Sequence, residues 1–166
     1  EAFSWNISFG LASAVATFVG QNYGAKNYDR IAKTYKIVLS NILILGGIIT
    51  VIFVFFPRPL YGIFFKDEKM ITLGISYLSI VGFSQLFMCA EITTSGAFNG
   101  MGKTLQPTLI SIIFTSLRIP IALILIPLLG LNGIWWSISL TSIAKGILVV
   151  ILFLIVLKKI DVKETK

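Results

Sequence analysis

Residues 37–56 read IVLSNILILGGIITVIFVFF, a run of twenty residues without one charged side chain. A helix of that length rises about 30 Å, which matches the hydrocarbon thickness of a bilayer. Lipid cannot satisfy the backbone groups of an open strand, so a spanning segment of this kind is helical. The stretch therefore predicts a transmembrane helix.

The rest of the chain has the same character. Of its 166 residues, 56% are hydrophobic and 13% are charged, whereas soluble domains carry about 25% charged residues. Further weakly charged stretches predict a polytopic, all-α transmembrane bundle in residues 1–157, followed by a basic tail at 158–166. The five helices are expected at about 2–20, 37–56, 71–98, 105–127 and 133–157. The chain opens on helical residues without an initiator Met, and we expect it to be part of a longer protein.

The basic residues are distributed unevenly between the two ends of these helices. Three fall on one side, namely Arg58, Lys66 and Lys69. Nine fall on the other side: Lys26, Arg30, Lys33, Lys36, Lys103, Lys158, Lys159, Lys163 and Lys166. Because basic loops stay in the cytoplasm, we expect a multi-pass cell-membrane protein with its N-terminus outside and its C-terminus inside. The net charge of +7 is then explained by basic cytoplasmic loops that lie near anionic membrane lipid. We expect no nucleic-acid partner.

The sequence lacks the residues that several kinds of functional site require. The chain has no His and one Cys, Cys89, which removes disulfide frameworks, most metal sites and His-based catalysis. Residues 97–104, AFNGMGKT, fit a relaxed phosphate-loop pattern, but they follow a predicted membrane helix rather than a strand. We interpret them as a tight turn, and we expect neither a bound metal nor an enzyme.

One carboxylate stands inside the predicted bundle. Glu91 is the single acid between Glu68 and Asp161, and a charge at the centre of a bilayer costs about 2.5–3.5 kcal/mol. Counting along the helices places Glu91 about 13 Å, and Arg118 and Lys145 about 18 Å, from the cytoplasmic ends. The similar depth predicts that Glu91 pairs with Arg118 or Lys145. Two interpretations remain: the pair neutralises buried charges, or Glu91 takes up and releases a cation.

Polar and small side chains recur at helical spacing on the first and third predicted helices. They form either packing faces or the lining of a cavity. The candidate cavity residues are Asn6, Ser13, Thr17, Ser84, Met88, Thr94 and Ser95, and Ala12, Ala16, Gly20 and Gly24 form a separate small-residue row. In the fourth helix, Pro120 predicts a bend, and Pro127 predicts the end of the helix.

Four segments together resemble the multidrug and toxic compound extrusion (MATE) family. They are GLASAVATFVGQNYGA at 10–25, GAFNGMGKTLQP at 96–107, RIPIA at 118–122 and GLNGIW at 130–135. The order and spacing of the segments carry the resemblance, which extends over essentially the whole chain.

The resemblance implies a twelve-helix transporter with two six-helix lobes, of which this chain would be helices 8–12 of the C-terminal lobe. Such proteins extrude organic cations and other drugs by alternating access, in exchange for H⁺ or Na⁺. An acid on helix ten contributes to cation or substrate binding in several branches, and Glu91 falls on that helix. The implied partners are the N-terminal lobe, helix seven, and cationic drugs or dyes, with no cofactor besides the coupling ion.

Other functions stay open. A flippase for lipid-linked saccharides, from the same superfamily, moves large anionic substrates, and Arg118 and Lys145 would suit such a cavity. A polytopic membrane enzyme would need a cluster of acids, a His or a nucleophile pair at one depth, and a purely structural membrane subunit would need none of these. Dye efflux separates a drug transporter from these alternatives.

Overall fold

The computed structural model describes the backbone of residues 1–164 and the side chains of residues 1–160. Residues 165 and 166, the end of the predicted tail, lie outside the described part. The described chain folds into helices alone, and five of them are long and apolar enough to cross a membrane, which confirms the predicted all-α bundle. The elements are α1 (Ala2–Gly24), α2 (Tyr28–Phe55), α3 (Pro57–Phe64), α4 (Glu68–Gly100), α5 (Leu105–Leu129) and α6 (Leu131–Glu164).

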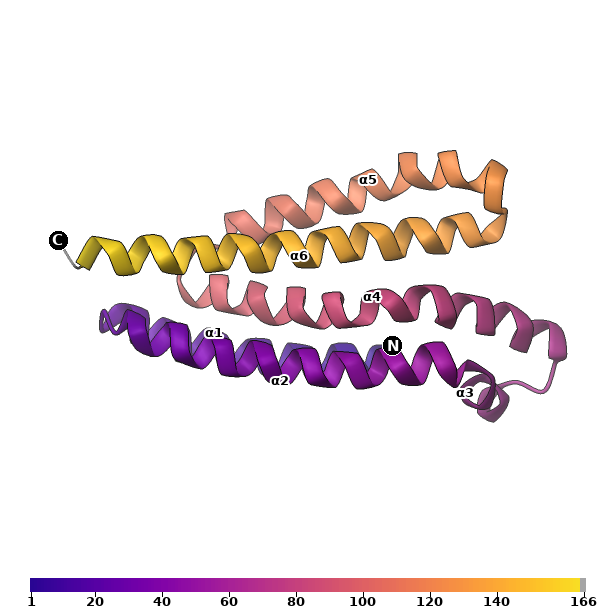
Figure 1. Cartoon of the computed structure of the whole chain (residues 1–166), viewed down its shortest axis with the longest axis horizontal. Helices are drawn as coiled ribbons and strands as arrows, with labels where there is room; N and C mark the ends of the chain where they lie inside the picture. Colours follow the sequence, from indigo (N-terminus) through magenta and orange to yellow (C-terminus); the bar gives the residue numbers. More distant parts are fainter. Residues whose placement is uncertain (165–166) are drawn as a thin grey trace.

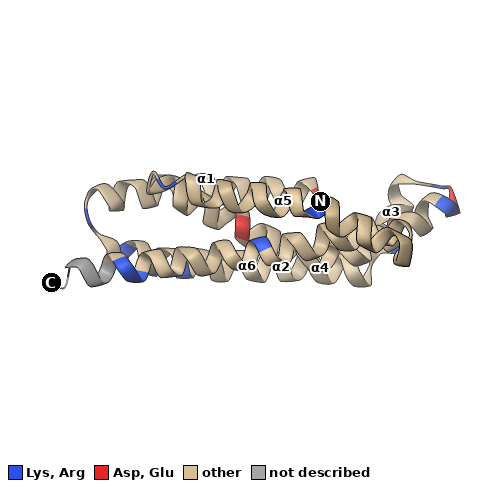
Figure 2. Cartoon of the chain, turned by 90° about the horizontal axis from the view of Figure 1, so that it is seen from above, with Lys and Arg blue, Asp and Glu red and all other residues tan. Residues whose placement is uncertain are grey.

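The five long helices lie side by side along the long axis of the molecule (Figure 1). The α1–α2 turn, the α4–α5 turn and the C-terminus share one end of the bundle, and α3 and the α5–α6 turn share the other. The turns use left-handed backbone at Lys26, Gly102 and Gly130, with φ of 59°, 71° and 59°. At Gly130 the absence of a Cβ makes this conformation inexpensive. Positions occupied by Lys or Arg lie mostly at the two ends of the bundle, and a few charged positions lie between the ends (Figure 2).

The helices are longer than their uncharged stretches predict. α2 begins at Tyr28 rather than at residue 37, and α6 continues through Glu164 into the predicted tail. Lys and Arg are good helix formers, so they extend a helix into the headgroup and water layers. The absence of charge therefore marks the hydrocarbon segment rather than the helix ends.

The short helix α3 is absent from the sequence prediction. The chain leaves α2 at Phe56, and Pro57 occupies the first position of α3, where its missing N–H costs nothing. The last residues of α3, Ile63 and Phe64, are exposed. The two prolines at 57 and 59 favour a loop in a sequence reading, yet at the start of a helix they are compatible with helical backbone.

α4 lies at the centre and packs against α1, α2 and α6. A Cβ at Gly96 would collide with the backbone of Ala12, and one at Gly100 would collide with the backbone of Ala16. Ala12 and Ala16 of the small-residue row are therefore points at which two membrane helices touch through their backbones, whereas Gly24 of the same row is exposed.

α5 packs mainly against α6 and lies at the edge of the bundle. It contains both Pro120 and Pro127, and Figure 1 shows it curving along its length. The sequence prediction that Pro127 ends this helix is wrong by two residues, because α5 continues to Leu129 and ends at Gly130.

Candidate functional site

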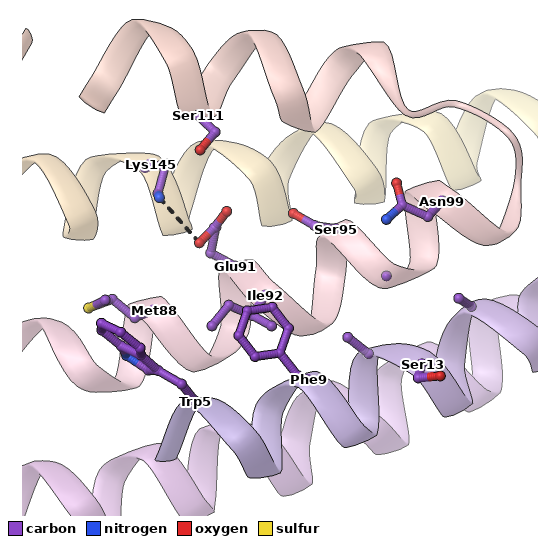
Figure 3. Close-up of a pocket in the computed structure, with 13 residues that line it drawn as sticks. Trp5, Phe9, Ser13, Met88, Glu91, Ile92, Ser95, Asn99, Ser111 and Lys145 are labelled. Carbon is purple, nitrogen blue, oxygen red and sulfur yellow. Dashed lines mark ion pairs between the residues drawn. The ribbon is translucent and has the colours of Figure 1, made fainter. Parts of the chain in front are cut away.

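A cavity of about 490 Å³ opens between α1, α4, α5 and α6. Figure 3 shows Trp5, Phe9 and Ser13 on its α1 side, Glu91 and Ser95 on α4, and Ser111 and Lys145 opposite. The full lining is Trp5, Phe9, Ala12, Ser13, Ala16, Met88, Glu91, Ile92, Ser95, Gly96, Asn99, Ser111 and Lys145. The wall thus combines aromatic rings, small residues and one charged pair.

The charged pair is Glu91 with Lys145. Lys145 Nζ lies 3.3 Å from Glu91 Oε2, and the two side chains are 12% and 13% exposed, respectively. Of the two partners considered from depth alone, the structure brings Lys145 to Glu91. The pair is shielded enough for its attraction to be strong, and it faces the cavity (Figure 3).

Arg118 lies apart from this pair. Its Nε donates to Thr141 Oγ1, and its Nη2 donates to Ser142 Oγ, both at 3.3 Å. These hydroxyls belong to α6, about one turn before Lys145 in the sequence. Arg118 therefore ties α5 to α6 through neutral groups and does not line the cavity.

The predicted stripe residues divide between the cavity and other surroundings. Ser13, Met88 and Ser95 line the cavity. Thr94 is buried, and its hydroxyl lies 2.9 Å from the Tyr35 hydroxyl of α2. The remaining candidates do not line it: Asn6 and Thr17 are exposed, and Ser84 is buried with its hydroxyl on the Val81 carbonyl.

A second, half-buried carboxylate lies at the start of α1 and was not identified from the sequence. Glu1 accepts hydrogen bonds from the Tyr77 hydroxyl and, at 2.7 Å, from Gln85 Nε2. Ser4 donates to Gln85 Oε1 at 3.1 Å. Burial raises the pKa of the nearby Tyr61 phenol, and the charge of Glu1 raises it further. The available signal was an acid standing directly before an apolar stretch, to which the sequence analysis assigned no role.

The geometry suits reversible binding of a cation. A carboxylate on a cavity wall can hold a proton or a metal cation, and aromatic faces such as those of Trp5 and Phe9 attract organic cations. Lys145 competes for the same carboxylate. A cation bound at Glu91 therefore either shares the carboxylate with the ammonium group or displaces it.

A family model described as MatE matches residues 2–124, well over half of the chain. The chain belongs to the MATE family. The match includes α1, the central helix α4 and most of α5, so it includes every cavity residue except Lys145.

Curated MATE proteins from bacteria are similar to most of this chain. It is 29% identical over 157 residues to the probable multidrug resistance protein NorM of Thermotoga maritima, which covers 93% of this chain and 34% of that protein. It is 25% identical over 128 residues to the probable multidrug resistance protein YoeA of Bacillus subtilis, which covers 75% of this chain and 28% of that protein. The chain thus spans about a third of the length of these relatives.

The fold is that of a solved MATE structure. An inward-facing multidrug resistance MATE family transporter of the MOP superfamily superposes with a TM-score of 0.81 at 18% identity. The superposition covers 95% of this chain and 39% of that one. At this identity the likeness establishes the helical arrangement of this MATE chain.

Proposed function

We propose that this chain is the C-terminal lobe, without its first helix, of a secondary active transporter that extrudes drugs or organic cations. Its five long helices would be helices 8–12 of twelve, and export would be driven by exchange for H⁺ or Na⁺ through alternating access. The observation that carries the proposal is the Glu91–Lys145 pair on the wall of the cavity between α1 and α4–α6.

Glu91 would be the coupling group. A proton or Na⁺ at its carboxylate weakens the attraction that holds Lys145 at 3.3 Å, because the carboxylate then carries less net charge. Lys145 is on α6 and Glu91 on α4, so occupancy of Glu91 changes the interaction between these two helices. A site that responds in this way links ion binding to a rearrangement, as exchange requires.

The substrates would be cationic drugs or dyes, which suits a cavity with Trp5 and Phe9 on one wall and Glu91 on another. The N-terminal lobe and helix seven would complete the pathway, since transporters of this type place their binding sites between repeats. Transport along this pathway would need no chemical reaction and no cofactor other than the coupling ion.

The protein would be a multi-pass cell-membrane protein with its C-terminus in the cytoplasm. The uneven distribution of Lys and Arg between the two ends of the bundle supports this orientation. Labelling of a Lys159→Cys variant by an impermeant thiol reagent outside intact cells would contradict it.

The decisive experiment is dye efflux driven by the full-length parent protein in inverted membrane vesicles. Separate H⁺ and Na⁺ gradients would be applied to the wild type, to Glu91→Gln and to Glu68→Gln. Glu68 is a matched control because its ion pair with Arg58 is exposed at the end of the bundle, with side chains 74% and 71% exposed.

We expect efflux under one gradient for the wild type and for Glu68→Gln, and its loss in Glu91→Gln. Undiminished efflux by Glu91→Gln would remove Glu91 from the coupling mechanism. Absence of dye transport under both gradients would contradict the drug-exporter proposal, and lipid-linked saccharides would then be the substrates to test.

A further inference from the structure

A second groove lies between α2 and α6, near the end of the bundle where α6 ends. It encloses about 310 Å³ and shares no residue with the Glu91 cavity. Its lining is Tyr28, Asp29, Ala32 and Lys36 of α2, and Leu154, Leu157 and Lys158 of α6. One lysine therefore comes from each helix.

The two lysines lie at the border of the hydrocarbon region. Lys36 directly precedes the uncharged stretch 37–56, and Lys158 directly follows the uncharged stretch 146–157. Both are exposed, and their ammonium groups can reach the headgroup layer while their stems stay along the helices. Two cations are thus held at the depth of lipid phosphates.

The α6 side of the groove is apolar. Leu154 and Leu157 form it; Leu154 is 39% exposed, whereas Leu157 is 8% exposed and belongs to the core. A free phosphate ion gains no favourable contact with an apolar wall, whereas an acyl chain does. The combination of two cations with an apolar wall in one groove matches a phospholipid.

The charge balance favours an acidic lipid. Lys36 and Lys158 give two positive charges, and Asp29 in the same lining gives one negative charge, so the groove carries a net charge of about +1. A lipid with one net negative charge balances it, whereas a zwitterionic lipid leaves it uncompensated. Figure 2 shows several Lys and Arg segments at this end of the bundle.

We propose that the groove formed by Lys36, Lys158, Leu154 and Leu157 is a binding site for one acidic phospholipid. The lipid phosphate lies between the two ammonium groups, and one acyl chain contacts the exposed side of Leu154. The site does not depend on Glu91 or on transport, so its failure in a test is distinguishable from failure of the proposed function.

The test measures lipid binding by the full-length parent protein, purified and delipidated in detergent. Phosphatidylglycerol and phosphatidylcholine with identical acyl chains are titrated, and bound lipid is counted by native mass spectrometry. The variant Lys36→Gln/Lys158→Gln is compared with Lys33→Gln/Lys159→Gln. The control removes the same charge from the same two helices, at exposed lysines that do not line the groove.

We expect the wild type to retain one phosphatidylglycerol in preference to phosphatidylcholine. The groove variant should bind it on the order of tenfold more weakly, since both charged contacts to the lipid phosphate are lost. The control should stay within about twofold, because its lysines do not line the groove and exposed charges contribute little. Equal losses in both variants, equal binding of the two lipids, or displacement by excess inorganic phosphate would each overturn the proposal. Circular dichroism confirms that all variants retain their helices.

Discussion

The central helix α4 and the peripheral helix α5 bury different kinds of residue. Half of the most apolar stretch of α4 is buried, against none of the corresponding stretch of α5. α4 buries polar side chains such as Gln85 and Thr93, whereas α5 exposes Ile119 and Leu123 at 67% each. Inside a membrane, small and polar residues identify the packed helix and large apolar ones the lipid-facing helix. This reverses the rule for soluble proteins.

The strongest test of this comparison is Gly96→Leu in α4 of the full-length parent. The new side chain would meet the backbone of Ala12, which cannot move aside as a flexible side chain could. We expect a loss of about 3 kcal/mol or more, seen as loss of the monodisperse peak in size-exclusion chromatography. Gly10→Leu is the control, since nothing lies near a Cβ at Gly10. Identical profiles for the two variants would refute the close α1–α4 contact.

The next effect concerns the charged pair that α4 shares with α6. Lys145→Met leaves the largely buried Glu91 carboxylate without its ammonium partner, and breaking a buried pair costs about 3 kcal/mol. We expect a lower melting temperature for this variant. The double variant Glu91→Gln/Lys145→Met should recover most of the loss, because no charge is then left unpaired. Equal melting of the single and double variants would show that the pair contributes nothing.

Arg118→Met tests the charge of α5 that lies away from the cavity. Its partner Thr141 also donates to the Ser137 carbonyl at 2.7 Å, so its hydroxyl stays satisfied when Arg118 is removed. We expect a cost of about 1 kcal/mol and a pH profile of efflux like that of the wild type. A shifted pH optimum would place Arg118 in contact with Glu91 during transport and would contradict the separation seen here.

The smallest effect is expected for Leu123→Ala on the exposed face of α5. With the side chain 67% exposed, the change should stay within about 0.5 kcal/mol. The same substitution at Leu78 of α4, which is 7% exposed, should cost about 2 kcal/mol. Thermal melting of the two variants measures the difference. A larger loss at Leu123 would show that α5 packs against another part of the full-length protein.

The spanning helices could be predicted because lipid imposes a length and excludes charge. Their ends could not, because Lys and Arg continue a helix beyond the hydrocarbon, as in the first turns of α2 and the last turns of α6. α3 was missed for a related reason: Pro57 favours a loop in isolation but fits the first position of a helix.

The depth of the charged residues in the membrane could be predicted from the sequence, but the direction in which their side chains point could not. Counting residues brought Glu91, Arg118 and Lys145 to one level, yet it could not choose between the two cations. The choice depends on which faces of α5 and α6 turn toward α4, and tertiary packing decides that. Thr94 and Ser95 illustrate the same limit, since adjacent residues differ by about 100° around a helix and only Ser95 reaches the cavity.

The glycine contacts have a mechanical consequence for the cavity. Gly96 holds α4 against Ala12 of α1, and Gly146 of α6 meets the backbone of Phe87 on α4. Gly133 of α6 likewise meets the backbone of Leu125 on α5. All four walls are therefore joined in series by main-chain contacts, α1 to α4, α4 to α6 and α6 to α5. On α5 this contact lies on the other side of Pro120 from Ser111, the residue that α5 contributes to the cavity. A proline that interrupts the helical hydrogen bonds thus separates the α5 lining from its contact with α6, which makes this wall the easiest of the four to bend.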